Sequence, residues 1–162
     1  MLSFDLGQHK YLRHSLNLLS HIFGPDRIRL ILGDSGETVP RFLSDNPGFE
    51  GICDVIFIDG DHTDEGALKD MVNFSKYANL GNNIVIVDDY DNLDVKRAWN
   101  VAVGEIGLIT ELNVIESDCV DEYEVVGGAV EGLGRLVPSK VREGQGGSMV
   151  IGTYTRRIDD EY

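Results

Sequence analysis

The sequence predicts an α/β protein built around a mostly parallel β-sheet. Short apolar runs alternate with segments of helical apolar spacing, which is typical of parallel strands joined by crossover helices. Three of the runs are nearly unbroken, as in strands buried on both faces of a sheet, and an aspartate closely follows each of them. The length of 162 residues, of which 42% are hydrophobic, fits a single domain over residues 1–162.

The apolar spacing defines the expected elements. Strands are expected at residues 2–4, 28–32, 54–58, 84–87, 108–115 and 148–154. Helices are expected at residues 12–23, 39–43, 65–78 and 95–103. The first helix should end at Gly24, and Gly81 should stop the third. Residues 117–147 are rich in glycine and long for a structureless connection, so they are predicted to be a mobile insertion, with a lid over a substrate pocket as the alternative.

The charge excludes several classes of partner. Asp and Glu number 28 against 14 Lys and Arg, a formal net charge of −14, which leaves no broad basic surface to bind nucleic acid or an anionic membrane. No apolar run reaches the roughly 18 residues that span a bilayer, and the N-terminus lacks the pattern of a secretory signal. We therefore expect a cytoplasmic protein that acts on a small molecule. Exposed strand edges would allow it to form a homo-oligomer.

Carboxylates gather where two of the predicted strands end. Asp59, Asp61 and His62 follow one strand, and Asp88 and Asp89 follow the next. Parallel strands joined by one helix are often neighbours, so Asp59, Asp88 and Asp89 should converge. Carboxylates this close raise one another's pKa or share a cation, and their hard oxygens suit Mg²⁺ or another divalent cation. The alternative is that each acid only caps the helix that follows it.

The segment from Gly33 to Glu37 also follows a predicted strand. It lacks the GxxxxGK[ST] pattern of a phosphate loop, which excludes a nucleoside triphosphatase. Asp34 and Ser35 could instead accept hydrogen bonds from an adenine amine or from ribose hydroxyls. A helix-capping turn is the commoner use of such residues.

A second hypothesis for the same residues is a phosphatase. The run Asp59-Gly60-Asp61-His62-Thr63 fits DxDx[TV], the motif of haloacid dehalogenase-type phosphohydrolases, with Asp59 as nucleophile and Asp61 as acid and base. In that family much more chain separates this motif from the late acidic pair than the single helix expected here. The spacing therefore leaves a metal-dependent phosphohydrolase as the alternative.

The order of these motifs resembles that of class I S-adenosylmethionine-dependent methyltransferases. The likeness is greatest to metal-dependent O-methyltransferases of the catechol and macrocin types, which carry an FIDGDH-like sequence after the fourth strand and an acidic pair such as VDDY after the fifth. Here these sequences are Phe57 to His62 and Val87 to Tyr90. The resemblance implies a Rossmann-like, mostly parallel sheet with flanking helices and a divalent-metal-assisted O-methylation of a small molecule.

The resemblance also implies roles for single residues. The metal ligands would be Asp59, Asp88 and Asp89, binding Mg²⁺ or another divalent cation. Asp61, which matches the second acid of the macrocin-type motif, would be the general base, with His62 as a substitute.

S-adenosylmethionine would bind at the same edge of the sheet. By the resemblance, Asp34 and Ser35 lie near its adenine, and Asp5, at the end of the family's second strand, faces its ribose. Asp59 borders the same cofactor site.

One part of the family pattern has no counterpart in the sequence. The glycine-rich GxGxG turn after the family's first strand would lie upstream of Asp5, and the sequence begins at Met1. The resemblance therefore implies an N-terminally truncated methyltransferase fold, in which a central strand is absent and both its neighbours lack ladder partners. A non-catalytic remnant that serves as a binding module is a third hypothesis.

Because a central strand is absent from the implied sheet, we expect residues 1–162 to have reduced stability and to bind S-adenosylmethionine weakly. Isothermal titration calorimetry of the chain measures this affinity directly. Tight binding of the cofactor would contradict the expectation.

Overall fold

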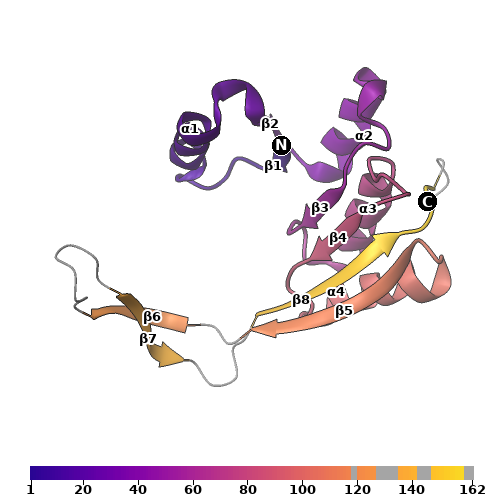
Figure 1. The fold of residues 1–162 in the computed structure, drawn as a ribbon. Coiled ribbons are helices and arrows are strands. Elements are labelled where there is room, and N and C mark those ends of the chain that lie inside the picture. Colours follow the sequence, from indigo (N-terminus) through magenta and orange to yellow (C-terminus); the bar gives the residue numbers. More distant parts are fainter. Residues whose placement is uncertain (118–119, 127–134, 142–146, 159–162) are drawn as a thin grey trace.

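The computed structural model describes residues 1–117, 120–126, 135–141 and 147–158 and confirms the predicted α/β class (Figure 1). Its strands are β1 (Leu2–Asp5), β2 (Arg29–Leu32), β3 (Val55–Ile58), β4 (Ile84–Val87), β5 (Ile109–Ser117), β6 (Val120–Val126), β7 (Arg135–Val141) and β8 (Gly147–Tyr154). Its helices are α1 (Leu12–Phe23), α2 (Ser35–Asp45), α3 (Asp64–Ser75) and α4 (Leu93–Asn100), with short helical turns η1 (Pro25–Arg27), η2 (Pro47–Phe49) and η3 (Val101–Glu105). No helix in this described part of the chain is long and apolar enough to cross a membrane.

Local sequence explains where the helices begin and end. α1 has the predicted bounds and ends at Gly24, whose φ of 96° few other residues adopt. α2 begins at Ser35, before the predicted residue 39, because the Asp34 side chain accepts the Gly36 N–H at 2.8 Å and caps the helix. α3 ends at Ser75, so the prediction that Gly81 stops it is wrong.

The strands of the α/β body form two sheets. In the larger sheet the order is β3–β4–β8–β5, with β3 and β4 parallel and β8 antiparallel to both of its neighbours. β1 and β2 form a separate parallel pair. Within the described residues β1 and β3 each pair on one side only, and both line a cavity of about 950 Å³. These are the two strands that the resemblance predicts to lack a partner.

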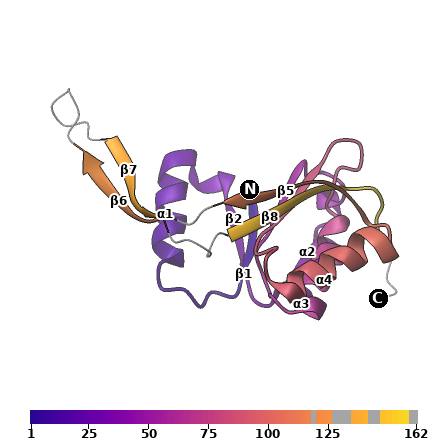
Figure 2. The ribbon, with the colours of Figure 1, turned by 90° about the horizontal axis from the view of Figure 1, so that it is seen from below.

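Helices cover one face of the larger sheet. Figure 2 shows α2, α3 and α4 gathered on one side of β5 and β8. The buried core contains side chains from these helices and from β3, β4 and β8, among them Val39, Ala67, Met71, Trp99, Ile56, Ile58, Val85, Val87 and Val150. Burial of this apolar surface holds the larger sheet and its helices together.

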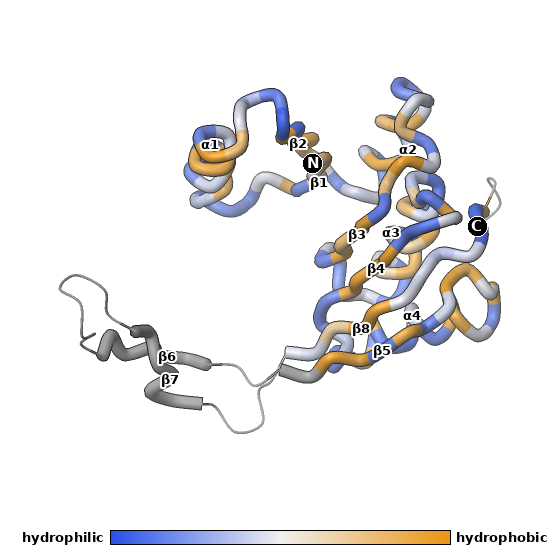
Figure 3. Tube along the Cα trace, viewed as in Figure 1, coloured by the Kyte–Doolittle hydropathy of each residue, from blue (hydrophilic) through white to orange (hydrophobic). Residues whose placement is uncertain are grey.

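The opposite face of β3 and β4 is open. Val55 is 64% exposed, Phe57 52% and Ile84 43%. Figure 3 shows the apolar character of this part of the sheet. The prediction that these strands are buried on both faces is therefore wrong, because the described helices cover only one face of them.

The pair β6 and β7 projects from the body of the protein (Figure 1). The two strands are antiparallel, with Val120 opposite Val141 and Val126 opposite Arg135. They lie within the insertion predicted at residues 117–147. The other parts of that insertion, 118–119, 127–134 and 142–146, lie outside the described residues.

Phe4 connects the β1–β2 pair to the helices. Its ring contacts the rings of Phe42, Phe74 and Tyr77, with centroid distances of 5.8, 5.7 and 6.2 Å. Edge-to-face contacts at these distances add to the burial of the rings. Because no ladder hydrogen bond joins the two sheets in the described residues, this aromatic cluster carries much of the contact between them.

We expect Phe4→Ala to lower the free energy of unfolding by roughly 2–4 kcal/mol, because it removes a ring from the cluster between the two sheets. The matched control is Phe57→Ala, which removes an exposed ring from β3 and should change the stability by only about 0.5 kcal/mol. Urea unfolding measures both values, and amide exchange should be faster in β1 and β2 of the Phe4 variant. Equal stability of the two variants would contradict this account.

Candidate functional site

The carboxyl ends of β1, β2 and β3 meet at the cavity of about 950 Å³. Ligands of open α/β sheets bind at this edge. The cavity is lined by residues that the sequence predicted to contact cofactor or substrate: Asp5, Asp34, Ser35, Asp59, Asp61 and His62. The fold therefore gathers these residues at one site.

Asp5 and Asp34 shape the turns that follow β1 and β2. The Asp5 carboxylate accepts the Gly7 N–H at 2.6 Å, and Gly7 has a φ of 78°. Asp34 caps α2, which is the helix-capping role considered for it. Since an ionised carboxylate has two oxygens, each side chain keeps the capacity to accept hydrogen bonds from a ligand in the cavity.

Asp59, His62 and Asp89 form a compact group beside this cavity. The Nε2 atom of His62 lies 3.0 Å from Oδ2 of Asp89 and 3.6 Å from Oδ1 of Asp59. One ligand atom from each residue lies within 4.8 Å of the others, and within the described ranges this is the one His, Cys, Asp or Glu group close enough to hold a metal ion. Two carboxylates and an imidazole fit a divalent cation such as Mg²⁺ or Mn²⁺.

The parallel pairing of β3 and β4 brings this group together. Ile58 lies opposite Val87, and the Asp88 N–H donates to the Ile58 carbonyl at 3.0 Å. The residues that follow the two strands therefore lie side by side. Asp89 has a φ of 52°, in the left-handed region, so the chain turns sharply after β4.

Asp88 takes a different position from the one that the resemblance implies. Its Oδ1 accepts the N–H of Asp89 at 2.9 Å. It is not part of the three-residue group found among the described residues, where His62 stands beside Asp59 and Asp89. The role of Asp88 as a metal ligand stays a prediction.

The surroundings raise the pKa of Asp89. Burial has the largest effect, and the neighbouring carboxylates of Asp88, Asp59 and Asp91 act in the same direction, whereas His62 lowers the pKa. Carboxylates held together in this way bind protons or cations more readily than an isolated one.

Helix capping does not account for Asp59 and Asp88. The N-cap of α3 is Thr63, whose hydroxyl accepts the Gly66 N–H at 3.1 Å. The N-cap of α4 is Asn92, whose side chain accepts from the N–H of Asp94. The capping alternative is therefore wrong for Asp59 and Asp88, although it holds for Asp34.

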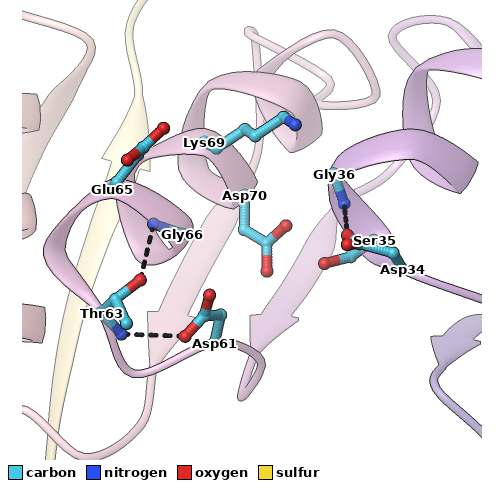
Figure 4. Close-up of a pocket in the computed structure, with 9 residues that line it drawn as sticks. All are labelled: Asp34, Ser35, Gly36, Asp61, Thr63, Glu65, Gly66, Lys69 and Asp70. Atoms are coloured by element: carbon cyan, nitrogen blue, oxygen red, sulfur yellow. Dashed lines mark hydrogen bonds between the residues drawn. The ribbon is translucent and has the colours of Figure 1, made fainter.

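A smaller pocket of about 200 Å³ lies between the start of α2 and the start of α3 (Figure 4). Asp61 points toward it, and its Oδ1 accepts the Thr63 N–H at 3.0 Å. Asp70 of α3 also lines this pocket and the larger cavity. Sequence reasoning missed Asp70, although an acid placed between Ala67 and Met71 on the apolar side of a helix is a signal that could have found it.

A family model described as a methyltransferase domain matches residues 2–90. The match covers both groups of acids and the predicted cofactor residues. No curated protein sequence matches the chain.

Solved structures similar to this chain include two longer proteins. The apo structure of CalS11, a TDP-rhamnose 3'-O-methyltransferase of calicheamicin biosynthesis, has a TM-score of 0.54 and 22% identity, covering 69% of this chain and 53% of that one. Cofactor-bound Rv0187 from MTB has a TM-score of 0.60 and 15% identity, covering 96% of this chain and 62% of that one. The chain thus spans less than two thirds of either protein, and at these identities the likeness shows the fold.

The cause of the raised pKa of Asp89 can be tested by substitution. Asp59→Asn removes a neighbouring negative charge and should lower the pKa of Asp89, whereas His62→Gln removes a positive partner and should raise it. Carboxyl ¹³C NMR titrations measure both shifts, with the exposed Asp26→Asn as control. A pKa of Asp89 that stays the same in both variants would contradict the arrangement of this group.

Proposed function

Because the chain belongs to the family of methyltransferase domains, we propose that it transfers a methyl group from S-adenosylmethionine to an oxygen of a small molecule, with the help of a divalent cation. One observation carries this proposal. The group formed by Asp59, His62 and Asp89 lies at the edge of the cavity that Asp5 and Asp34 also line. A cofactor site and a site for a metal-bound acceptor would therefore be adjacent.

Asp5, Asp34 and Ser35 would bind the nucleoside part of the cofactor. Carboxylates and a hydroxyl accept hydrogen bonds from ribose hydroxyls and from an adenine amine. The cavity of about 950 Å³ is large enough for a nucleoside-sized ligand together with part of an acceptor. S-adenosylmethionine, when bound, supplies a methyl group on a positively charged sulfur, which the acidic walls of the cavity favour.

Asp59 and Asp89 would hold the cation, for which Mg²⁺ is the first candidate. A cation held by these residues would supply a Lewis acid, which would suit two neighbouring oxygens of an acceptor and would lower the pKa of a hydroxyl among them. The acceptor class that suits this site is therefore a small molecule with two adjacent oxygens, such as a vicinal diol or a catechol.

His62 would accept the proton of the acceptor hydroxyl. The imidazole would take up the hydroxyl proton while the acceptor oxygen gains the methyl group that S-adenosylmethionine would supply, the cofactor leaving as a thioether. An imidazole exchanges protons near neutral pH, which suits a general base. Asp61, the base implied by the resemblance, lines both the smaller pocket and the larger cavity, and its Oδ1 already accepts a backbone N–H. His62 lies in the group with Asp59 and Asp89, so we assign the proton to His62 instead.

The proposal predicts methyl transfer from methyl-labelled S-adenosylmethionine to a catechol or vicinal-diol acceptor, dependent on Mg²⁺ and abolished by EDTA. Asp59→Asn and Asp89→Asn should lower the rate on the order of 100-fold by weakening the metal site. His62→Gln should lower it about 10²–10⁴-fold, and the Mn²⁺ affinity of this variant tells whether the imidazole also binds the cation. Asp26→Asn is the matched control and should keep full activity.

The other variants and substrates separate the alternatives. A larger loss of methyl-transfer rate in Asp88→Asn than in Asp89→Asn would favour the ligand set implied by the resemblance. A larger loss of rate in Asp61→Asn than in His62→Gln would favour Asp61 as the base. Release of phosphate from an aryl phosphate, without methyl transfer, would support the phosphohydrolase. Absence of both methyl transfer and phosphate release would support the hypothesis of a non-catalytic binding module.

A further inference from the structure

We propose that Asp70 is a positioning residue that ties the loop after β2 to the loop after β3 and thereby couples the cofactor side of the site to the metal side. Its functional consequence rests on the proposed function above. The contact itself can be tested without any ligand.

Asp70 is a buried acid on α3. Its side chain is 3% exposed, and it lies on the inner side of the helix with Ala67 and Met71. Acids in such positions are rare unless they have a partner, since removing a carboxylate from water costs free energy. The position therefore calls for contacts that compensate for this cost.

The first contact is with the loop after β2. The Ser35 side chain, at the first residue of α2, lies close enough to the Asp70 carboxylate to lower its pKa, and both residues line the smaller pocket. Figure 4 shows the Asp70 side chain pointing into the space between Ser35 and Asp61. Ser35 is one of the residues assigned to the cofactor, so Asp70 borders a group that faces the ligand.

The second contact is with the loop after β3. A Cβ atom placed on Gly60 would lie 2.5 Å from Oδ2 of Asp70, and within 4 Å it would meet only Asp70 among the described residues outside its chain neighbours. Glycine lets the backbone approach the carboxylate closely at this point. Gly60 lies between Asp61 and Asp59, which is assigned to the metal. Asp70 therefore supports the backbone of the loop that carries Asp59 and His62.

The charged groups around Asp70 fit a carboxylate that has a structural role. Burial raises its pKa most, and the carboxylates of Asp34 and Asp61 raise it further, while Ser35 and Lys69 lower it. Its neighbours of like charge thus come from both loops. A shift of either loop changes the contacts that Asp70 makes with the other, which is the physical basis of the coupling.

Lys69 provides a matched control on the same helix. Its Nζ lies 3.5 Å from Oε1 of Glu37, so it links α3 to α2 just as Asp70 does. Lys69 does not approach Gly60, because the Cβ position there meets only Asp70 in the described part of the chain. Lys69→Gln therefore removes a link between the same two helices and leaves the loop after β3 in place.

The ligand-free test is a double-mutant cycle between Gly60 and Asp70. Gly60→Ala should lower the melting temperature by roughly 3–10 °C, because the new methyl group overlaps the carboxylate. In the Asp70→Ser background the same change should cost much less, because the shorter side chain leaves room. In the Asp70→Asn background, which keeps the volume, the full cost should remain. An equal cost of Gly60→Ala in all three backgrounds would overturn the contact.

The functional test is the mutual effect of two ligands, measured by calorimetry with S-adenosylmethionine and Mn²⁺ on chain 1–162. Each ligand should strengthen binding of the other about 5-fold or more in the wild type and in Lys69→Gln. Asp70→Ser should bind each ligand alone and lose this mutual effect, and Asp70→Asn, which keeps the volume of the side chain, should keep part of it. Coupling that survives in Asp70→Ser, or is absent from a wild type that binds both ligands, would overturn the inference. A wild type that binds neither ligand would refute the proposed function. The double-mutant cycle would then be the one remaining test of the contact between Gly60 and Asp70.

Discussion

The parallel pairing of β3 with β4 is the constraint on which the candidate site depends. With Ile58 opposite Val87 and the Asp88 N–H bonded to the Ile58 carbonyl, the chain leaves both strands at the same level of the sheet. A shift of one residue in this register would turn the side chains that follow toward the other face. The core side chains of β3 and β4, buried under α3 and α4, hold the register, so packing on one side of the sheet determines the position of the acids at its edge.

The sequence predicted the parts of the fold that local pattern determines. Unbroken apolar runs located β3 and β4, and the aspartates after them indicated the functional edge, because strand ends of a parallel sheet meet there. The open face of β3 was not predictable in the same way. An apolar run shows that a strand is suited to burial, whereas exposure of Val55 and Phe57 depends on which helices the rest of the chain brings to that face.

The composition of the group formed by Asp59, His62 and Asp89 also depends on more than sequence order. Neighbouring acids in a loop can point in opposite directions, and the left-handed backbone at Asp89 decides which side chain after β4 faces His62. Spacing alone predicted that Asp88 and Asp89 both join Asp59, whereas the Asp88 carboxylate accepts a hydrogen bond within its own turn. Asp70 was missed for a related reason, since its partners Ser35 and Gly60 lie in two distant loops and become neighbours only when α2 and α3 pack together.

Because the strands are divided into two sheets, side-chain contacts between the sheets matter more for this site than they would in a continuous sheet. Asp5 and Asp34 follow strands of the smaller sheet, while Asp59 and Asp89 follow strands of the larger one. In a continuous sheet, ladder hydrogen bonds would fix the distance between the two groups. In the described residues no ladder crosses from β1 to β3, so the Phe4 aromatic cluster and the contacts of α2 with α3 must set that distance. The proposed methyl transfer requires its reactants in line and close together, so the geometry of this site is only as firm as the packing between the two sheets.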